Sequence, residues 1–199
     1  MQPRLVICAS GEGTNFEAIV QATRSGLLAA EVAGLIVNRE GTGAAQRAAS
    51  LGVPVRTLIP KNFDDRSRWD GAMAEQLRQW GADWVVLAGF LTLVGGQVLR
   101  AFPGRVVNSH PALLPRFGGE GMYGDRVHAA VLAAGARETG VTVHLVDPEY
   151  DRGRILLAER VEVLPGDTVD TLSARVKACE NRFYPRVLND LVCGRITTG

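Results

Sequence analysis

The first half of the chain alternates short apolar segments with amphipathic ones, and this order restricts the fold more than any other feature. The apolar segments have the length of buried strands and lie at residues 5–9, 32–37, 53–58, 84–88 and 105–108. The amphipathic segments are predicted helices at residues 15–24, 43–51 and 65–80. Strands separated by single helices predict an α/β fold with an open, mainly parallel sheet and helices on both faces.

The second half of the chain departs from this order. A helix is predicted at 126–134, but the apolar segments at 141–146 and 155–163 have no helix between them. Consecutive strands without a crossover helix pair in antiparallel fashion, so we expect these two to extend the sheet as antiparallel strands. A final amphipathic helix is predicted over 169–192, with a kink or a restart at Pro185.

Length and composition place these elements in one globular unit. The 199 residues fit a single domain, and a content of 46% hydrophobic and 22% charged residues is sufficient for a buried core. The formal net charge of +1 gives no electrostatic attraction to nucleic acid or to an acidic membrane. No apolar run reaches the length of a membrane span and no signal peptide is evident, so we expect a soluble cytoplasmic protein.

The cysteine pattern argues against a metal site. The three cysteines, Cys8, Cys179 and Cys193, cannot all pair with one another, and none has zinc-finger or Cys-x-x-Cys spacing. We therefore expect reduced thiols and no bound metal.

The segment 105–115 contains the first candidate site. An apolar run at 105–107 leads into Asn108 and His110, and the period of two in a strand places both side chains on the same side. Asn108 offers an uncharged donor to an oxyanion, whereas His110 can transfer a proton at neutral pH, so the pairing suits acyl transfer. The alternative is that Asn108 is a turn residue and His110 a hydrogen-bonded histidine without a catalytic role.

A glycine-rich loop follows the first predicted strand. It consists of Gly11, Glu12, Gly13, Thr14 and Asn15. Backbone amides at the start of the following helix can bind a phosphate. Phe16 occupies the third glycine position of a dinucleotide fingerprint and no Walker lysine is present, so a single terminal phosphate suits the loop better than NAD or ATP. The alternative is an ordinary turn capped by Thr14 or Asn15.

Carboxylates gather in the turn between the two late strands, at Asp147, Glu149 and Asp151. A carboxylate close to His110 would favour the imidazolium and raise the pKa of His110, which would make the imidazole a better proton donor at neutral pH. The alternative is an acidic turn on the surface without a functional role.

Taken together, three motifs resemble the glycinamide ribonucleotide formyltransferases of purine biosynthesis. They are Ser-Gly-x-Gly-Thr-Asn near the N-terminus, Asn-x-His-Pro-Ala-Leu-Leu-Pro in the middle, and His-x-Val ahead of the turn that contains Asp151. The motifs follow the family's order over nearly the whole chain. The resemblance implies a Rossmann-like sheet and an enzyme that transfers the formyl group of 10-formyltetrahydrofolate, a co-substrate, to the amine of glycinamide ribonucleotide.

The resemblance also implies roles for individual residues. The implied catalytic residues are Asn108, His110, Asp151 and His144. The implied ribonucleotide contacts are Gly11, Glu12, Gly13, Thr14, Asn15 and Glu180. The implied folate contacts are Arg66, Leu91, Thr92, Leu93, Val94, Asn108, Asp147 and Glu149.

The family's organisation divides the single domain 1–199 into two halves. Residues 1–104 are implied to bind the phosphate and the ribonucleotide, and residues 105–199 to bind the folate and carry the catalytic groups. In the implied chemistry the ribonucleotide amine is the nucleophile, Asn108 and protonated His110 stabilise the oxyanion, and Asp151 holds His110 charged. Neither nucleic acid nor a membrane takes part, and a homodimer is left open.

Several positions depart from the family's pattern. Thr92 stands where some members have arginine, Lys177 where some have glutamine, and Arg152 interrupts a frequent Asp-Gly-Gly. The segment 117–124 is a longer glycine-rich form of the loop after the central motif. These departures concern contacts rather than chemistry. His128 lies outside every motif and is predicted to be structural.

Other functions remain as alternatives at this point. A hydrolase could release formate from the same folate, but it has no use for a phosphate loop. A formyltransferase acting on methionyl-tRNA would need a tRNA-binding domain and a basic surplus. A non-catalytic nucleotide sensor on the same sheet would not need Asn108, His110 and Asp151 together.

Overall fold

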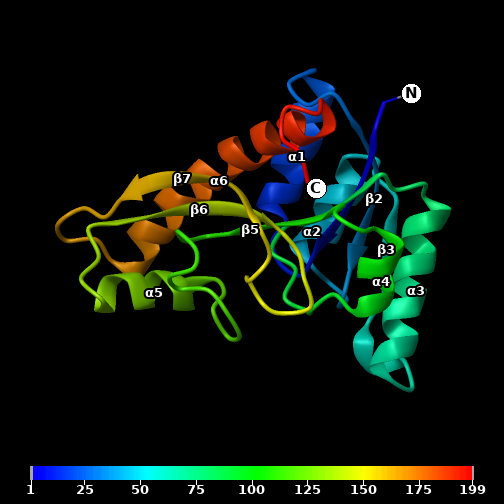
Figure 1. The fold of residues 1–199 in the computed structure, drawn as a ribbon, viewed down its shortest axis with the longest axis horizontal. Helices are drawn as coiled ribbons and strands as arrows, with labels where there is room; N and C mark the ends of the chain where they lie inside the picture. The colour runs from blue at the N-terminus through cyan, green and yellow to red at the C-terminus, as the bar shows by residue number, and fades with distance from the viewer. Residues whose placement is uncertain (1, 199) are drawn as a thin grey trace.

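The computed structural model describes residues 2–198, which form one seven-stranded sheet in the order β3-β2-β1-β4-β5-β6-β7 (Figure 1). The strands are β1 (Arg4–Ala9), β2 (Glu31–Val37), β3 (Val55–Thr57), β4 (Trp84–Leu87), β5 (Val106–His110), β6 (Glu138–Leu145) and β7 (Ile155–Glu162). Strands β1 to β5 are parallel, whereas β5–β6 and β6–β7 are antiparallel pairs. The predicted mainly parallel sheet with an antiparallel extension is therefore confirmed.

Helices cover both faces of this sheet (Figure 1). They are α1 (Thr14–Arg24), α2 (Gly43–Ser50), α3 (Arg66–Gln79), α4 (Gly96–Ala101), α5 (Asp125–Ala133) and α6 (Val169–Val192), with a 3-10 turn η1 (Pro60–Asn62). In β1, Leu5 and Ile7 pack in the core shared with α1 and α6, whereas Val6 and Cys8 pack in the core shared with α3 and α4. A strand buried on both faces needs a continuous apolar run, as the sequence of β1 provides.

Some elements differ from the sequence prediction. Strand β3 has only three residues, because Pro54 cannot donate a ladder hydrogen bond, and the short helix α4 was not predicted. Strand β5 continues to His110, since Asn108 and His110 pair with β6 residues. The predicted restart at Pro185 is wrong, because α6 runs through this buried proline without a break.

The strand order also fixes where a ligand can bind. Strand β1 lies between β2 and β4, and the helices that follow β1 and β4 pack on opposite faces of the sheet. The connections after these two strands therefore diverge and leave a crevice at the carboxyl edge, where open α/β sheets bind their ligands. Within residues 2–198, no helix is both long and apolar enough to cross a membrane.

Candidate active site

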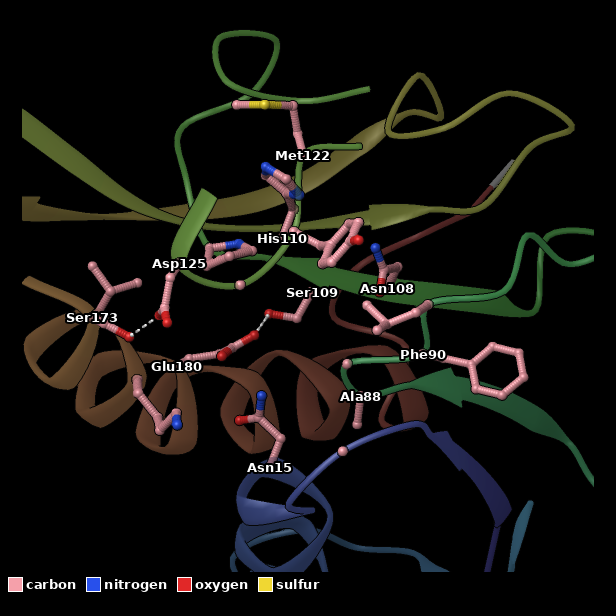
Figure 2. A pocket seen from close by; sticks show the side chains of 18 of the residues that line it. Asn15, Ala88, Phe90, Asn108, Ser109, His110, Met122, Asp125, Ser173 and Glu180 are labelled. Atoms are coloured by element: carbon pink, nitrogen blue, oxygen red, sulfur yellow. Dashed lines mark hydrogen bonds between the residues drawn. The ribbon is translucent and has the colours of Figure 1, made fainter. Parts of the chain in front are cut away.

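A cavity of about 390 Å³ lies at this carboxyl edge. Its wall is formed by the glycine-rich loop after β1, the ends of β4 and β5, the segment 119–124, the turn at Tyr150 and Asp151, and one face of α6 (Figure 2). The loop, the strand-end motif and the acidic turn are distant in sequence, and the fold brings all three to one cavity.

The end of β5 supplies side chains to both faces of the sheet. Asn108 and His110 lie on one side, where Asn108 pairs with His144 of β6. Ser109 points to the other side, toward α6, and its hydroxyl donates a hydrogen bond to Glu180 (Figure 2). This alternation is the period of two that the sequence predicts for the strand.

Two histidine side chains, those of His110 and His144, meet the carboxylate of Asp151. The Nδ1 atom of His110 lies 3.4 Å from Oδ2 of Asp151, and the Nε2 atom of His144 lies 3.5 Å from Oδ1 of the same carboxylate. Both histidine side chains are buried, and that of Asp151 is 9% exposed. The structure thus brings together the four residues Asn108, His110, His144 and Asp151, which the sequence singled out as the implied catalytic group.

The predicted increase in the pKa of His110 is wrong. Burial lowers the pKa of His110 and outweighs the charge of Asp151 and the hydrogen bond to the Phe117 carbonyl, both of which raise it. The sequence revealed the carboxylate, but it could not show how deeply the ring is buried. His110 is therefore neutral at pH 7, and its 2.7 Å contact with Phe117 O places the proton on Nε2, which donates to that carbonyl.

Asp151 is ionised in this environment. Burial raises the pKa of Asp151, but the contact with His144, the charge of His110 and the amide of Gly119 together lower it below its ordinary value. The Gly119 amide donates to Oδ2 at 3.0 Å. Asp151 has a left-handed backbone with φ of 55°, a conformation that aspartate and asparagine tolerate better than most residues.

The amide of Asn108 is oriented by His144. The Nδ1 atom of His144 lies 2.8 Å from the Leu145 carbonyl and donates to it, which leaves Nε2 facing Asn108. Nε2 then accepts a hydrogen bond from Asn108 Nδ2 at 3.1 Å. One amide hydrogen of Asn108 is used in this way, and the second remains for a ligand in the cavity.

The glycine-rich loop forms the opposite wall of the cavity, which all five of its residues line. The N-cap of α1 is Gly13, with φ of 78° and no side-chain capping bond, so the alternative of a cap by Thr14 or Asn15 is wrong. A Cβ at Gly13 would lie 2.5 Å from the Cα of Ala44, whereas a Cβ at Gly11 would meet nothing within 4 Å. The close packing of α2 requires glycine at 13, and the open cavity lies beside Gly11.

The residues implied for folate binding are only partly at the cavity. Leu91 and Asn108 line it, and Leu91 is 45% exposed. Val94 is 2% exposed and packs in the core with α3 and α4, so its side chain has no surface to offer in this structure. The members of the set that do not line the cavity are Arg66, Thr92, Leu93, Val94, Asp147 and Glu149.

Local contacts account for several of these positions. The Arg66 guanidinium donates to the Leu93 carbonyl and lies 4.3 Å from the centre of the Trp69 ring. The Thr92 hydroxyl accepts from Asn38 at 2.7 Å. These contacts order the segment after β4 around the mouth of the cavity rather than inside it.

The cavity wall also contains residues that the sequence did not single out for function. They include Phe90, Met122, Tyr123, Asp125, Tyr150 and Ser173. His128, interpreted as structural, is 4% exposed yet lines the cavity too, and burial lowers its pKa. Glycines at 119, 121 and 124 in the same segment were the available signal, because they favour an irregular loop near a ligand.

No group of three or more histidine, cysteine, aspartate or glutamate side chains within residues 2–198 could hold a metal ion. The cysteines in this part of the chain are free thiols, and burial raises the pKa of Cys179 to about 11.

An open α/β sheet that joins a glycine-rich loop to an Asn-His-Asp cluster at its carboxyl edge is the arrangement of a group-transfer enzyme. A family model described as formyl transferase matches residues 3–188, and the chain belongs to that family. The resemblance found in the three sequence motifs is thereby confirmed.

Individual relatives are more specific. The chain is 42% identical, over 97% of its length, to the chloroplastic phosphoribosylglycinamide formyltransferase of Vigna unguiculata, and spans 62% of that protein. It is 33% identical to the phosphoribosylglycinamide formyltransferase of Bacillus subtilis, covering 95% of this chain and 94% of the relative. The crystal structure of glycinamide ribonucleotide transformylase 1 from Symbiobacterium toebii superposes with a TM-score of 0.94 at 37% identity, over 100% of this chain and 91% of that one.

Proposed function

We propose that the protein transfers the formyl group of 10-formyltetrahydrofolate to the amine of glycinamide ribonucleotide. The observation that carries this proposal is the meeting of Asn108, His110 and Asp151 in the same cavity as the glycine-rich loop. A reaction between a phosphorylated amine and a formyl donor needs a phosphate-binding loop and catalytic side chains that lie no further apart than the length of one small ligand. The names of the relatives support the same reaction.

The loop is suited to the phosphate of the ribonucleotide. Backbone amides at the start of α1, together with the helix dipole, attract an anion, and Gly11 leaves its side open. Glu180 on α6 also lines this cavity, where a carboxylate can accept hydrogen bonds from ribose hydroxyls. The glycinamide amine would then extend toward the end of β5.

Asn108 and His110 act on the formyl group in this scheme. Attack of the amine on the formyl carbon places negative charge on the formyl oxygen, and the free amide hydrogen of Asn108 stabilises it. The Nε2 hydrogen of His110 serves the same oxygen once it leaves the Phe117 carbonyl. The formyl oxygen therefore takes the place of the Phe117 carbonyl as the acceptor of the His110 hydrogen bond.

The proton of the attacking amine passes to the His110 and Asp151 pair. His110 is neutral at pH 7 because burial lowers its pKa, so its Nδ1 lone pair can take up a proton. The ionised carboxylate of Asp151, 3.4 Å away, stabilises the imidazolium that results. The pair then returns the proton to the departing folate nitrogen, and no side chain forms a covalent bond.

The mouth of the cavity fits a flat, partly apolar co-substrate. Leu91 and Tyr150 line the cavity and are both exposed, which gives an aromatic ring system two surfaces to contact. We infer that the pterin lies there, and that Arg66, the backbone at 92–94 and the carboxylates of Asp147 and Glu149 contact the more polar parts of the folate. The tetrahydrofolate supplies the activated formyl group, and the protein supplies the donors around it.

A folate absorbance assay tests this function. Purified protein with 10-formyltetrahydrofolate should release tetrahydrofolate only when glycinamide ribonucleotide is added, and formylglycinamide ribonucleotide should appear in equal amount. Release of formate without the ribonucleotide would instead indicate the hydrolase. Binding of the ribonucleotide in calorimetry with no turnover would indicate a sensor and would overturn the proposal.

A further inference from the structure

The middle residue of the Asn-Ser-His segment has no role in the scheme above. Ser109 is 6% exposed and points away from Asn108 and His110, toward α6. Its Oγ atom lies 2.6 Å from Oε1 of Glu180, which is 8% exposed, and donates a short hydrogen bond to it (Figure 2). Strand β5 therefore contacts both the reacting end of the cavity and the carboxylate at its ribose end.

Few groups are available to stabilise the charge of Glu180. Burial raises the pKa of Glu180, while the hydroxyl of Ser109, the side chain of Asn15 and the charge of Lys177 lower it. Two titratable groups on the same helix, Tyr184 and Cys179, interact with Glu180. The pKa of Tyr184 is raised well above its ordinary value and that of Cys179 to about 11, so both stay neutral at physiological pH.

We propose that Ser109 is a positioning residue for the ribonucleotide, which keeps the Glu180 carboxylate ionised and oriented so that its remaining lone pairs accept the substrate hydroxyls. This inference rests on the proposed function. A carboxylate can accept about four hydrogen bonds, so the bond from Ser109 leaves room for a ligand. The short bond selects one rotamer of Glu180 before the substrate arrives, which reduces the entropy lost on binding.

Two substitutions that introduce side chains of nearly identical shape distinguish the effect of the Ser109 hydroxyl from the effect of side-chain packing. Ser109→Thr keeps a hydroxyl and Ser109→Val replaces it with a methyl group, and both side chains suit a strand. We expect Ser109→Val to raise the KM and the calorimetric Kd for glycinamide ribonucleotide by about tenfold, the loss expected for a hydrogen bond to a charged group. The Kd for a folate analogue should stay unchanged, kcat should fall by less than about threefold, and Ser109→Thr should restore most of the affinity.

The pH dependence provides a readout that a packing defect would not produce. Without the hydroxyl, the pKa of Glu180 rises further, so a larger fraction is protonated at low pH. Relative to the wild type, the affinity of Ser109→Val for the ribonucleotide should therefore be weakest at the acid end of the pH range and approach the wild-type value as the pH rises. A structural role would weaken binding equally at every pH.

A double-mutant cycle with Glu180→Gln assigns the effect to this pair, because Ser109→Val should have no further effect once the carboxylate is gone. If Ser109→Val does not fold, Ser109→Ala, which removes only the oxygen, takes its place. Equal affinity of the threonine and valine variants at every pH would overturn the proposal. Failure of the wild-type protein to transfer a formyl group would contradict the proposed function instead, since ribonucleotide binding is measured separately.

Discussion

At the residue scale, the chemistry of the cavity depends on His110 and the two oxygen atoms that face its ring. The Phe117 carbonyl and the Asp151 carboxylate both raise the pKa of His110, and burial lowers it by more. A neutral imidazole beside an ionised carboxylate is suited to take up a proton. Asn108 belongs to the same cluster, because His144 contacts both Asn108 and Asp151.

Removal of either member of the proton-accepting pair should reduce turnover. We expect His110→Ala and Asp151→Asn each to lower kcat by about a hundredfold or more, as for other general acid–base groups. Asparagine is the appropriate replacement because it tolerates the left-handed backbone at position 151. Asp64→Asn, at an exposed surface carboxylate, is the matched control. A folded His110→Ala protein with wild-type turnover would rule out the proposed role.

The pH profile of the residual activity gives a second prediction. The neutral form of His110 is required, so kcat should fall as the pH drops through the pKa of His110, which lies below its ordinary value of 6.5. Asp151 raises this pKa, so Asp151→Asn should move the acid limb of the kcat profile to lower pH. A shift toward higher pH would show that the two groups interact with the opposite sign.

At the element scale, the loop between β1 and α1 has to satisfy both the ligand and α2. Gly11 borders open space, and Gly13 combines a left-handed backbone with close contact to Ala44. Gly11 can therefore be replaced without disturbing the packing of α1 against α2, whereas Gly13 cannot.

Gly11→Val should weaken glycinamide ribonucleotide binding by about tenfold or more and leave folate binding unchanged, because the side chain would enter the phosphate-binding part of the cavity. Calorimetry with each ligand separately measures this. Equal loss of both affinities would contradict the placement of the phosphate at the loop.

Gly13→Ala should act on stability instead. The left-handed backbone alone costs about 1–2 kcal/mol for a non-glycine residue, and the contact with Ala44 adds to it. Gly26→Ala is a matched control, because Gly26 has φ of 79° but no atom within 4 Å of a new Cβ. In urea denaturation, the free energy of unfolding should fall further for Gly13→Ala than for Gly26→Ala.

At the scale of the whole molecule, α6 connects the parallel and antiparallel parts of the sheet. The hydroxyl of Tyr184, which is fully buried, lies 3.1 Å from the Leu87 carbonyl on β4 and 3.2 Å from the Val107 carbonyl on β5. The same helix carries Glu180 into the cavity, so its seating on β4 and β5 affects both stability and the site.

Tyr184→Phe should lower the free energy of unfolding by about 1–3 kcal/mol, because the single hydroxyl hydrogen that the two carbonyls share is lost in a buried environment. Tyr123→Phe, at an exposed tyrosine, controls for the loss of a hydroxyl without burial. An unchanged free energy of unfolding in the first variant would mean that these contacts add nothing to the stability of the fold.

The sequence predicts the sheet well, because buried parallel strands such as β1 require continuous apolar runs and the helices between them have clear periodicity. It misses α4, whose six residues are too few for a periodic pattern. The convergence of Asn108, His110 and Asp151 follows from motifs, but the pKa direction of His110 does not, because it depends on burial by distant segments. The contact of Ser109 with Glu180 also requires coordinates, since it joins residues 71 positions apart.

Both oxygen groups that face the His110 ring belong to non-glycine residues with left-handed backbones, Phe117 at φ of 59° and Asp151 at φ of 55°. Neither residue is part of the sheet, so the imidazole is fixed by β5 while two connecting segments supply the groups that raise its pKa. Substitutions in those segments can adjust the acidity range in which the protein works and leave the scaffold intact. Variation among relatives in the length of the segment after the Pro-Ala-Leu-Leu-Pro motif should therefore accompany differences in pH optimum, with the strands unchanged.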